Sequence, residues 1–252
     1  MLSKNKIKLI QSLKRKKNRD EAGLFVAEGE KLVTELISVG FQIQTLITTN
    51  SKVNRYSGLK VEICTASYDE IKKVSSLTTP QDVIAICRQK TSMLKKVDFG
   101  KELIIALDDI QDPGNLGTII RLASWFGIKH IICSAHTVDC FNPKVIQSTM
   151  GAIAHVSLHY TSLPDFLISA RESSGRIYGT FLDGNNIYTT PLEKSGIIIM
   201  GNEGQGISES VEELVNQKLY IPSFAPDNTQ VESLNVSVAT SIVCSEFMRR
   251  TL

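Results

Sequence analysis

The sequence lacks the features that mark several specialised classes of protein. No apolar run approaches the length of about 18 residues that a membrane-spanning helix requires, and no internal repeat or low-complexity tract occurs. The basic N-terminus is not followed by an apolar stretch, so we expect no secretory signal peptide. With 252 residues and a hydrophobic fraction of 42%, the chain is predicted to fold as one large globular domain or two smaller ones.

Cysteine is sparse, and its spacing is not that of a disulfide framework. The chain has 5 cysteines and no C-x-x-C, which favours reduced thiols in a cytoplasmic protein. Four residues of zinc-binding type lie close together in sequence, namely His130, Cys133, His136 and Cys140. Residues three apart in the expected strand K-H-I-I-C face opposite sides of the sheet, however. We therefore expect no metal, and interpret the four residues as buried thiols and surface histidines.

Two nucleotide-binding motifs are missing from the glycine-rich segment 201–208, which reads G-N-E-G-Q-G-I-S. A dinucleotide-binding site needs G-x-G-x-x-G directly after a strand, and the glycine spacing here is different. A P-loop needs a lysine before its final Ser or Thr, and Ile207 occupies that position. These departures argue against a dehydrogenase and against an NTPase.

The net charge of +2 conceals an uneven distribution. Residues 1–95 hold 17 Lys and Arg against 9 Asp and Glu, whereas residues 96–252 hold 11 against 17. Eight of the basic residues lie between Lys4 and Arg19, where no acidic residue occurs. A basic run of this kind is either a solvated helix face or a surface that meets a polyanion. The contrast between the two parts of the chain favours contact with a polyanion.

The first 95 residues are predicted to form a small α/β unit. The expected helices are a basic helix over 3–17, a helix that begins after Glu30 and ends near Gly40, and a short helix capped by Ser67. The expected strands are apolar runs at 24–27, 43–48 and 83–87. A lysine-rich polar stretch follows, from Lys90 to Lys101. We take it as the boundary between domains 1–95 and 96–252.

Residues 96–252 alternate between apolar strands and helical patterns. The strands are expected at 103–107, 129–133, 176–181, 196–200 and 218–221, and the helices at 116–126, 143–150, 164–173, 208–216 and 235–249. Alternation of this kind predicts an α/β fold in which a parallel sheet carries helices on both faces.

Three polar stretches of the second domain each follow a strand and lead into a helix. The first contains Asn115 and Arg121 in the pattern N-x-x-x-x-x-R, the second is G-N-E-G-Q-G at 201–206, and the third is S-L-N-V-S-V-A at 233–239. Taken alone, each is explained as a tight turn, a capped helix or a solvated arginine. Their occurrence together in this order makes chance a poor explanation.

In this order the three stretches resemble the motifs of the SpoU/TrmH family of RNA ribose methyltransferases, within the SPOUT class. The resemblance implies transfer of a methyl group from S-adenosyl-L-methionine to a ribose 2′-OH of rRNA or tRNA. It also implies a deep trefoil knot in domain 96–252 and a homodimer. The run F-V-A-E-G-E-K-L-V at 25–33 resembles the family's RNA substrate-binding domain, which is similar to the ribosomal L30e fold. The alternative is a non-catalytic RNA-binding or ribosome-assembly factor of the same fold.

The resemblance also assigns site residues by motif position. The catalytic residues implied in this way are Arg121, Asn115, Glu203, Ser233 and Asn235, and the cofactor contacts are Met200, Gly201, Gly206, Ile221 and Leu234. The RNA contacts expected in the first domain are Lys4, Lys14, Arg15, Lys16, Lys17 and Arg19. Ser233 or Asn235 is in addition the expected N-cap of the last helix.

Arg121 is the residue on which we expect catalysis to depend most. The family's arginine is regarded as a general base, but a guanidinium is effectively always protonated. We therefore expect Arg121 to bind the target phosphate and to stabilise the developing alkoxide, with proton removal shared with that phosphate. Glu203 is expected to orient either Arg121 or a target nucleotide. The loop from Ile221 to Ser233 is longer than the family's, which leaves its donor contacts open.

Overall fold

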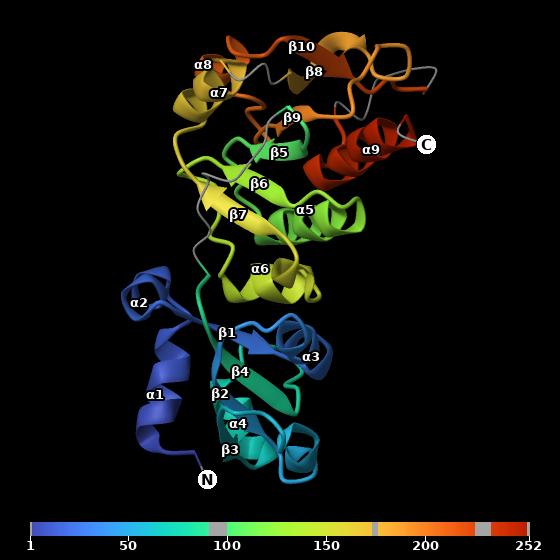
Figure 1. The fold of residues 1–252 in the computed structure, drawn as a ribbon. Coiled ribbons are helices and arrows are strands. Elements are labelled where there is room, and N and C mark those ends of the chain that lie inside the picture. The colour runs from blue at the N-terminus through green and yellow to red at the C-terminus, as the bar shows by residue number, and fades with distance from the viewer. Residues whose placement is uncertain (1, 91–99, 173–175, 225–232, 251–252) are drawn as a thin grey trace. The chain divides into compact units, whose positions relative to one another are not determined.

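The computed structural model describes residues 2–90, 100–172, 176–224 and 233–250 (Figure 1). The chain separates into two compact units. The first comprises Met1–Thr91 together with Asp139–Ala154, and the second comprises Ser92–Val138 and His155–Leu252. Most of the stretch predicted as a domain boundary lies outside the described residues.

The first unit contains a four-stranded mixed sheet in the order β1-β4-β2-β3. Its strands are β1 (Leu24–Glu28), β2 (Ile43–Thr48), β3 (Glu62–Thr65) and β4 (Val83–Arg88). β4 is antiparallel to both of its neighbours, and β2 and β3 are parallel. The three predicted strands are confirmed. The apolar pattern does not predict β3, because none of its residues is fully buried.

The helices of this unit are α1 (Lys4–Ser12), α2 (Lys16–Ala22), α3 (Glu30–Ser38), the 3-10 turn η1 (Val53–Tyr56) and α4 (Tyr68–Val74). The prediction of one helix over 3–17 is wrong, because the chain bends after the C-cap Leu13 and divides it into α1 and α2. Ser67 caps α4 in a reciprocal capping box with Glu70, as predicted. Gly40 has φ +70° just after the C-cap of α3, the conformation expected of a C′ glycine.

Residues 139–154 belong to the first unit although they lie in sequence between two strands of the second. They contain α6 (Pro143–Ser148) and the 3-10 turn η3 (Ala152–Ala154). The ring of Phe141 packs against Phe25 of β1, with ring centroids 4.9 Å apart. The helix predicted at 143–150 therefore exists, but it belongs to the first unit and not, as we expected, to the unit of the parallel sheet. It packs on β1 instead.

The second unit is built on a six-stranded sheet in the order β10-β8-β9-β5-β6-β7, with every pairing parallel. The strands are β5 (Leu103–Leu107), β6 (His130–Cys133), β7 (Ser157–Tyr160), β8 (Ile177–Asn186), β9 (Gly196–Met200) and β10 (Gln217–Tyr220). The predicted parallel sheet is confirmed. β7 escapes prediction because His159 is its one fully buried residue. The central strands β5 and β9 are buried throughout, as strands covered on both faces should be.

Helices cover both faces of this sheet, as predicted. On one face, α7 (Leu163–Glu172) and α8 (Glu209–Glu212) bury apolar side chains against strand residues such as Ile104 and Ile199. Tyr178 faces the other side and meets Phe247 edge-on, with ring centroids 4.9 Å apart. Phe247 lies in α9 (Val236–Arg249), which packs beside α5 (Pro113–Trp125). In the part of the chain that the structure describes, no helix is long and apolar enough to cross a membrane.

Candidate active site

The first motif forms the beginning of α5. Pro113 occupies the first turn, where its missing N–H costs nothing, and Asp112 is the N-cap. The Asp112 carboxylate accepts a hydrogen bond from the backbone N–H of Asn115 at 2.9 Å. The helix therefore begins three residues earlier than predicted. This start places Asn115 in the first turn and Arg121 two turns further along.

The second motif is a closed turn between β9 and α8. Asn202 and Gly206 exchange backbone hydrogen bonds of 2.8 and 3.0 Å. A Cβ added to Gly201 would lie 2.3 Å from the carbonyl carbon of Gly206, and Gly206 itself has φ +73°. Both glycines are therefore required by the turn itself, whatever else they contact.

Two side chains hold this turn against the loop that follows β5. The Asp108 carboxylate, which is 6% exposed, accepts hydrogen bonds from the N–H and the hydroxyl of Ser208 at 2.8 and 2.7 Å. The Asn202 amide donates to the carbonyl oxygen of Asp109 at 2.7 Å. None of these residues was predicted as part of the site. Their position in the sequence could have indicated them, because polar residues directly after two neighbouring parallel strands meet at one edge of the sheet.

The third motif forms the beginning of α9. Asn235 is the N-cap, and its side-chain oxygen accepts from the N–H and the hydroxyl of Ser237 at 3.0 and 2.7 Å. This settles the predicted choice of cap in favour of Asn235 over Ser233. Ser233 is exposed. It makes no hydrogen bond with any described residue.

The far end of α9 is fixed by a carboxylate and two guanidinium groups. Glu246 is 6% exposed and accepts hydrogen bonds from Arg249 and Arg250. These bonds, that of Arg249 above all, lower the pKa of Glu246 to about 2 although burial opposes the shift. Arg250 also donates to the carbonyl oxygens of Ile187 and Thr190, at 3.0 and 2.6 Å. α9 is thereby attached to the loop that follows β8.

The three motifs meet through their side chains. Asn115 donates from its amide nitrogen to Glu203 Oε1 at 2.8 Å, and its amide oxygen accepts from Asn235 Nδ2 at 3.0 Å. The second carboxylate oxygen of Glu203 accepts from the backbone N–H of Gln111 at 3.5 Å. One residue of each motif is thus part of a single hydrogen-bonded chain. Because both ends of the Asn115 amide are engaged, its orientation is fixed.

Arg121 lies on the exposed side of α5, whereas Ile119 and Ile120 next to it are fully buried. Its guanidinium makes no hydrogen bond or ion pair with the described residues. The structure therefore does not join Arg121 to Glu203, which was one of the two expectations for that carboxylate. Glu203 orients Asn115 instead.

The residues expected to contact the cofactor lie at the ends of β9 and β10 and before α9. Met200 is buried at the end of β9, Ile221 follows β10, and Leu234 is 46% exposed. Among the described residues, the backbone N–H groups of Gly201, Ile221 and Leu234 have no hydrogen-bond partner. Unpaired backbone groups of this kind suit a ligand that is recognised mainly through the main chain. The part of the longer loop over 225–232 lies outside the described residues.

Five of the six cations expected to contact RNA are exposed, namely Lys4, Lys14, Arg15, Lys16 and Lys17. The expectation for Arg19 is wrong, because its side chain is 2% exposed and pairs with Asp139 at 2.6 Å. A buried guanidinium that already has an ionic partner is not available to a phosphate.

The suggested zinc cluster is arranged differently in the structure. His130 Nδ1 lies 3.1 Å from Nε2 of His159, a residue outside the suggested set. Cys133 and Cys140 are buried and form no disulfide with a described residue. Within the described residues, no group of three or more His, Cys, Asp and Glu is placed to hold a metal ion.

Solved structures share this fold over nearly the full length of the chain. A protein from Porphyromonas gingivalis, described as an RNA methyltransferase of the TrmH family, matches with a TM-score of 0.90 and 37% identity, covering 99% of each chain. An AdoMet-bound rRNA methyltransferase from Sinorhizobium meliloti matches with a TM-score of 0.89 and 30% identity, over 100% of this chain and 97% of that one. The fold and the site together define an RNA methyltransferase of the SPOUT class that uses S-adenosylmethionine.

Family models narrow this assignment. The SpoU rRNA Methylase family matches residues 102–245, and the MRM3-like substrate binding domain matches residues 4–85. In Bacillus subtilis (strain 168), the 23S rRNA (guanosine(2553)-2′-O)-methyltransferase RlmP is 31% identical over 240 residues, which are 94% of this chain and 94% of the relative. The chain belongs to the SpoU rRNA methylase family, as the resemblance implied. It is an S-adenosylmethionine-dependent RNA 2′-O-methyltransferase.

Proposed function

We propose that this enzyme methylates a ribose of ribosomal RNA, and that Arg121, Asn115, Glu203, Ser233 and Asn235 form its catalytic set. The observation that carries the proposal is the chain of hydrogen bonds that joins Glu203 to Asn115 at 2.8 Å and Asn115 to Asn235 at 3.0 Å. The three residues come from three separate motifs. A non-catalytic RNA-binding factor would not require an ordered chain of polar side chains at this place, since phosphate binding needs only accessible cations.

The donor is proposed to lie against the ends of β9 and β10. Met200, Gly201, Gly206, Ile221 and Leu234 would hold it, and the unpaired backbone N–H groups of this set support recognition through the main chain. When bound, S-adenosylmethionine supplies a methyl group that is already activated on a sulfonium. The loops that carry these residues are proposed to be threaded into the trefoil knot of the family.

Arg121 is proposed to act on the acceptor. A permanently charged, planar guanidinium binds a phosphate through two parallel hydrogen bonds. Placed there, it also stabilises the negative charge that develops on the 2′-oxygen as the proton leaves. The phosphate held by Arg121 is the proposed proton acceptor. The exposure of Arg121 and its lack of a partner among the described residues support this role.

Asn115 is proposed to position the target nucleotide. Its side chain is fixed by Glu203 and Asn235, and it lies in the first turn of α5. The free N–H groups at the beginning of a helix favour a phosphate. Glu203 therefore acts through Asn115, and not by direct contact with Arg121.

The first unit is proposed to recruit the RNA. Its exposed cations Lys4, Lys14, Arg15, Lys16 and Lys17 lie on α1, on α2 and at the bend between them. The match of residues 4–85 to a substrate-binding domain supports this role. Phosphate contacts by such cations would supply affinity without sequence specificity.

The enzyme is proposed to be a homodimer that forms through the second unit. Trp125 of α5 is 84% exposed and Val238 of α9 is 48% exposed, and the two helices pack beside one another. Large apolar side chains exposed on packed helices are a common mark of an interface. We also place the enzyme in the cytoplasm, because its five cysteines form no disulfide among the described residues and a reducing compartment suits them.

Mapping of ribose methylation in rRNA from a deletion strain tests the proposal. One or a few 2′-O-methyl groups should disappear from ribosomal RNA, and expression of the enzyme should restore them. The position named for the Bacillus subtilis relative, guanosine 2553 of 23S rRNA, is the first to inspect. A loss confined to tRNA would overturn the choice of substrate. Calorimetry with S-adenosylmethionine then separates the enzyme from a non-catalytic factor, which would release no heat of binding.

A further inference from the structure

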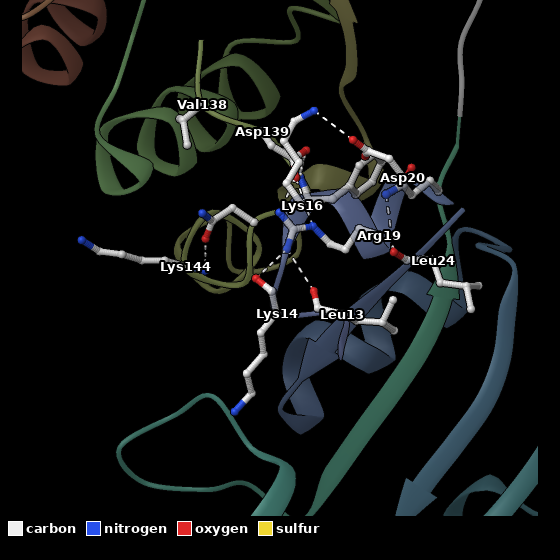
Figure 2. Close-up of polar contacts among 12 residues, drawn as sticks. Leu13, Lys14, Lys16, Arg19, Asp20, Leu24, Val138, Asp139 and Lys144 are labelled. Carbon is white, nitrogen blue, oxygen red and sulfur yellow. Dashed lines mark hydrogen bonds and ion pairs between the residues drawn. The ribbon is translucent and has the colours of Figure 1, made fainter. Parts of the chain in front are cut away.

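Arg19 joins three segments of the first unit through one buried side chain (Figure 2). Its Nε and Nη2 atoms donate to Asp139 Oδ2 at 3.1 and 2.6 Å. Its Nη1 atom donates to the carbonyl oxygens of Leu13 and Lys14 at 2.9 and 3.0 Å. Because Arg19 itself lies in α2, these bonds connect α2 to the end of α1 and to the segment 139–154.

The bonds from Nη1 determine the bend between α1 and α2. Leu13 is the C-cap of α1, and carbonyl groups at a helix C-terminus carry partial negative charge that a cation stabilises. Without Arg19, the buried carbonyl oxygen of Leu13 and the part-buried one of Lys14 would lose this donor, which is costly. The exposed cations from Lys14 to Lys17 lie at this bend. Arg19 therefore fixes how those cations are displayed.

The segment 139–154 is fitted to the first unit along its whole length. At its start, the Asp139 Oδ1 atom accepts from the N–H of Phe141 at 3.0 Å, and Phe141 packs on Phe25. Near its end, Gly151 has φ +101°, and a Cβ there would lie 3.0 Å from the Glu35 side chain. The segment is therefore packed into the first unit as part of its structure.

The segment also carries an exposed cation of its own. Lys144 is exposed on α6, and its backbone N–H is held by Asn142 at 2.9 Å. Figure 2 shows the side chains of Lys144 and Lys14 extending away from the central Arg19. The carboxylate of Asp139, five residues before Lys144, is engaged by Arg19.

The acidic residues of α2 pair with its lysines but leave them exposed. Lys16 pairs with Asp20 at 3.0 Å and Lys17 pairs with Glu21 at 3.9 Å, and all four side chains are about half exposed or more. Exposed pairs of this kind contribute little and exchange readily for a phosphate. Arg15 adds a further exposed cation at the same place. The ligand that fits this arrangement is a polyanionic backbone.

We propose that residues 139–154 are part of the RNA-binding surface, with Lys144 contacting a phosphate and Arg19 acting as the positioning residue that assembles the surface. This inference rests on the proposed role of the first unit in RNA recruitment. It implies that domain 1–95, read from the sequence, lacks one piece of its own binding surface. That piece is supplied by a segment from the middle of the chain.

Fluorescence anisotropy with a labelled RNA hairpin of mixed sequence, titrated with the full-length enzyme, tests the contribution of Lys144. Lys144→Gln should raise the Kd about three- to tenfold and lower the slope of log Kd against log salt by about one unit. Lys60→Gln is the matched control, because Lys60 is also an exposed lysine of the first unit but lies before β3. An unchanged Kd for Lys144→Gln overturns the inference.

The role of Arg19 is tested on the same probe. Arg19→Lys and Asp139→Asn should each raise the RNA Kd about tenfold or more, because a lysine cannot reproduce the guanidinium fork. Since both variants break one pair, Arg19→Lys/Asp139→Asn should be no worse than either single variant. The Kd for S-adenosylmethionine should not change, whereas general unfolding would abolish it. Additive losses in the double variant contradict a shared role.

Lys14→Gln/Lys16→Gln separates the role of residues 139–154 from RNA recruitment by the first unit as a whole. If this double variant weakens RNA binding and Lys144→Gln does not, the inference about 139–154 fails alone. If neither weakens binding, RNA recruitment by the first unit fails with it. We expect both variants to bind the RNA hairpin more weakly than the Lys60→Gln control does.

Discussion

Asn115 donates a 2.8 Å hydrogen bond to Glu203, a residue 88 positions away in the sequence. The same amide accepts a 3.0 Å bond from Asn235, 120 positions away. Side chains from three separate motifs are thus held in one orientation before any substrate arrives. In an enzyme that must align a donor and an acceptor, such preorganisation lowers the barrier without covalent chemistry.

The contact between Asn115 and Glu203 predicts non-additive kinetics. Glu203→Ala should lower the single-turnover rate by about 10 to 100-fold, because loss of the acceptor frees the Asn115 amide to rotate. Asn115→Ala should have a comparable effect. If the two residues act as one unit, Asn115→Ala/Glu203→Ala should be no slower than the worse single variant. Rates that multiply would show instead that the residues act independently.

The two hydrogen bonds from Ser208 to Asp108 predict a selective loss of donor affinity when Asp108 is replaced. Asp108→Ala removes the acceptor of two hydrogen bonds and should raise the Kd for S-adenosylmethionine about tenfold or more. Asp108→Asn keeps an acceptor oxygen and should restore most of the affinity. Calorimetry provides both values, with the exposed Asp165→Asn as control. Equal donor affinity for Asp108→Ala and the wild type would mean that the turn holds its shape without these two hydrogen bonds.

The pKa of Glu246 predicts how stability depends on pH. Its folded value of about 2 lies below the ordinary value of 4.5. The carboxylate therefore stabilises the folded state fully above about pH 5, and this contribution disappears as the pH falls towards 2. Glu246→Gln should cost about 1 to 3 kcal/mol at pH 7 and progressively less below pH 5.

Thermal melts from pH 3 to pH 7 measure this difference. The gap between the melting temperatures of the wild type and Glu246→Gln should narrow as the pH falls. Glu213→Gln removes a carboxylate that is exposed, so it should leave the curve unchanged. A gap that stays constant over the whole pH range would refute the assignment of the stabilisation to the charge of Glu246.

Exposed apolar side chains on α5 and α9 predict the state of assembly. Trp125→Glu should convert a dimer to a monomer, because it places a charge in the proposed interface. Leu182→Glu is the matched control, since Leu182 of β8 is also 70% exposed but lies on neither helix. Light scattering after size-exclusion chromatography measures the mass. A monomeric wild-type enzyme would rule out the dimer.

The elements that could be predicted from sequence are those that a short run of neighbouring residues determines. The apolar runs at Leu103–Leu107 and Gly196–Met200 predict buried parallel strands, and Asn235 has the chemistry of an N-cap. The partner of Asn115 could not be derived in this way. It depends on β9 pairing with β5, two strands that are far apart in sequence.

The segment around Arg19 shows the same limit. In a run of basic residues each side chain has the same local preference for solvent. Arg19 is buried because its acidic partner, Asp139, comes from 120 positions further along the chain. The helix at 143–150 was predicted correctly, but its place on β1 follows from that tertiary contact and from Phe141. Sequence periodicity predicts that a helix has a buried face, but it does not predict which sheet that face packs against.

Arg121 predicts a change in rate without a change in donor binding. Arg121→Ala should keep the fold, because the side chain is exposed while its neighbours Ile119 and Ile120 form the core. The single-turnover rate should fall about 100-fold or more, as expected when one preorganised electrostatic contact is lost. Arg121→Lys should restore little, because a point charge cannot replace the planar fork. Transfer by Arg121→Ala at the wild-type rate would remove Arg121 from the mechanism.

The identity of the methylated atom tests the account most directly. RNA methylated by the enzyme with isotopically labelled S-adenosylmethionine is digested to nucleosides and analysed by mass spectrometry. The account predicts that the labelled methyl group stays with the ribose when the glycosidic bond breaks, as in a 2′-O-methylnucleoside. A labelled methyl group on the released base would contradict the roles proposed for Arg121 and Asn115.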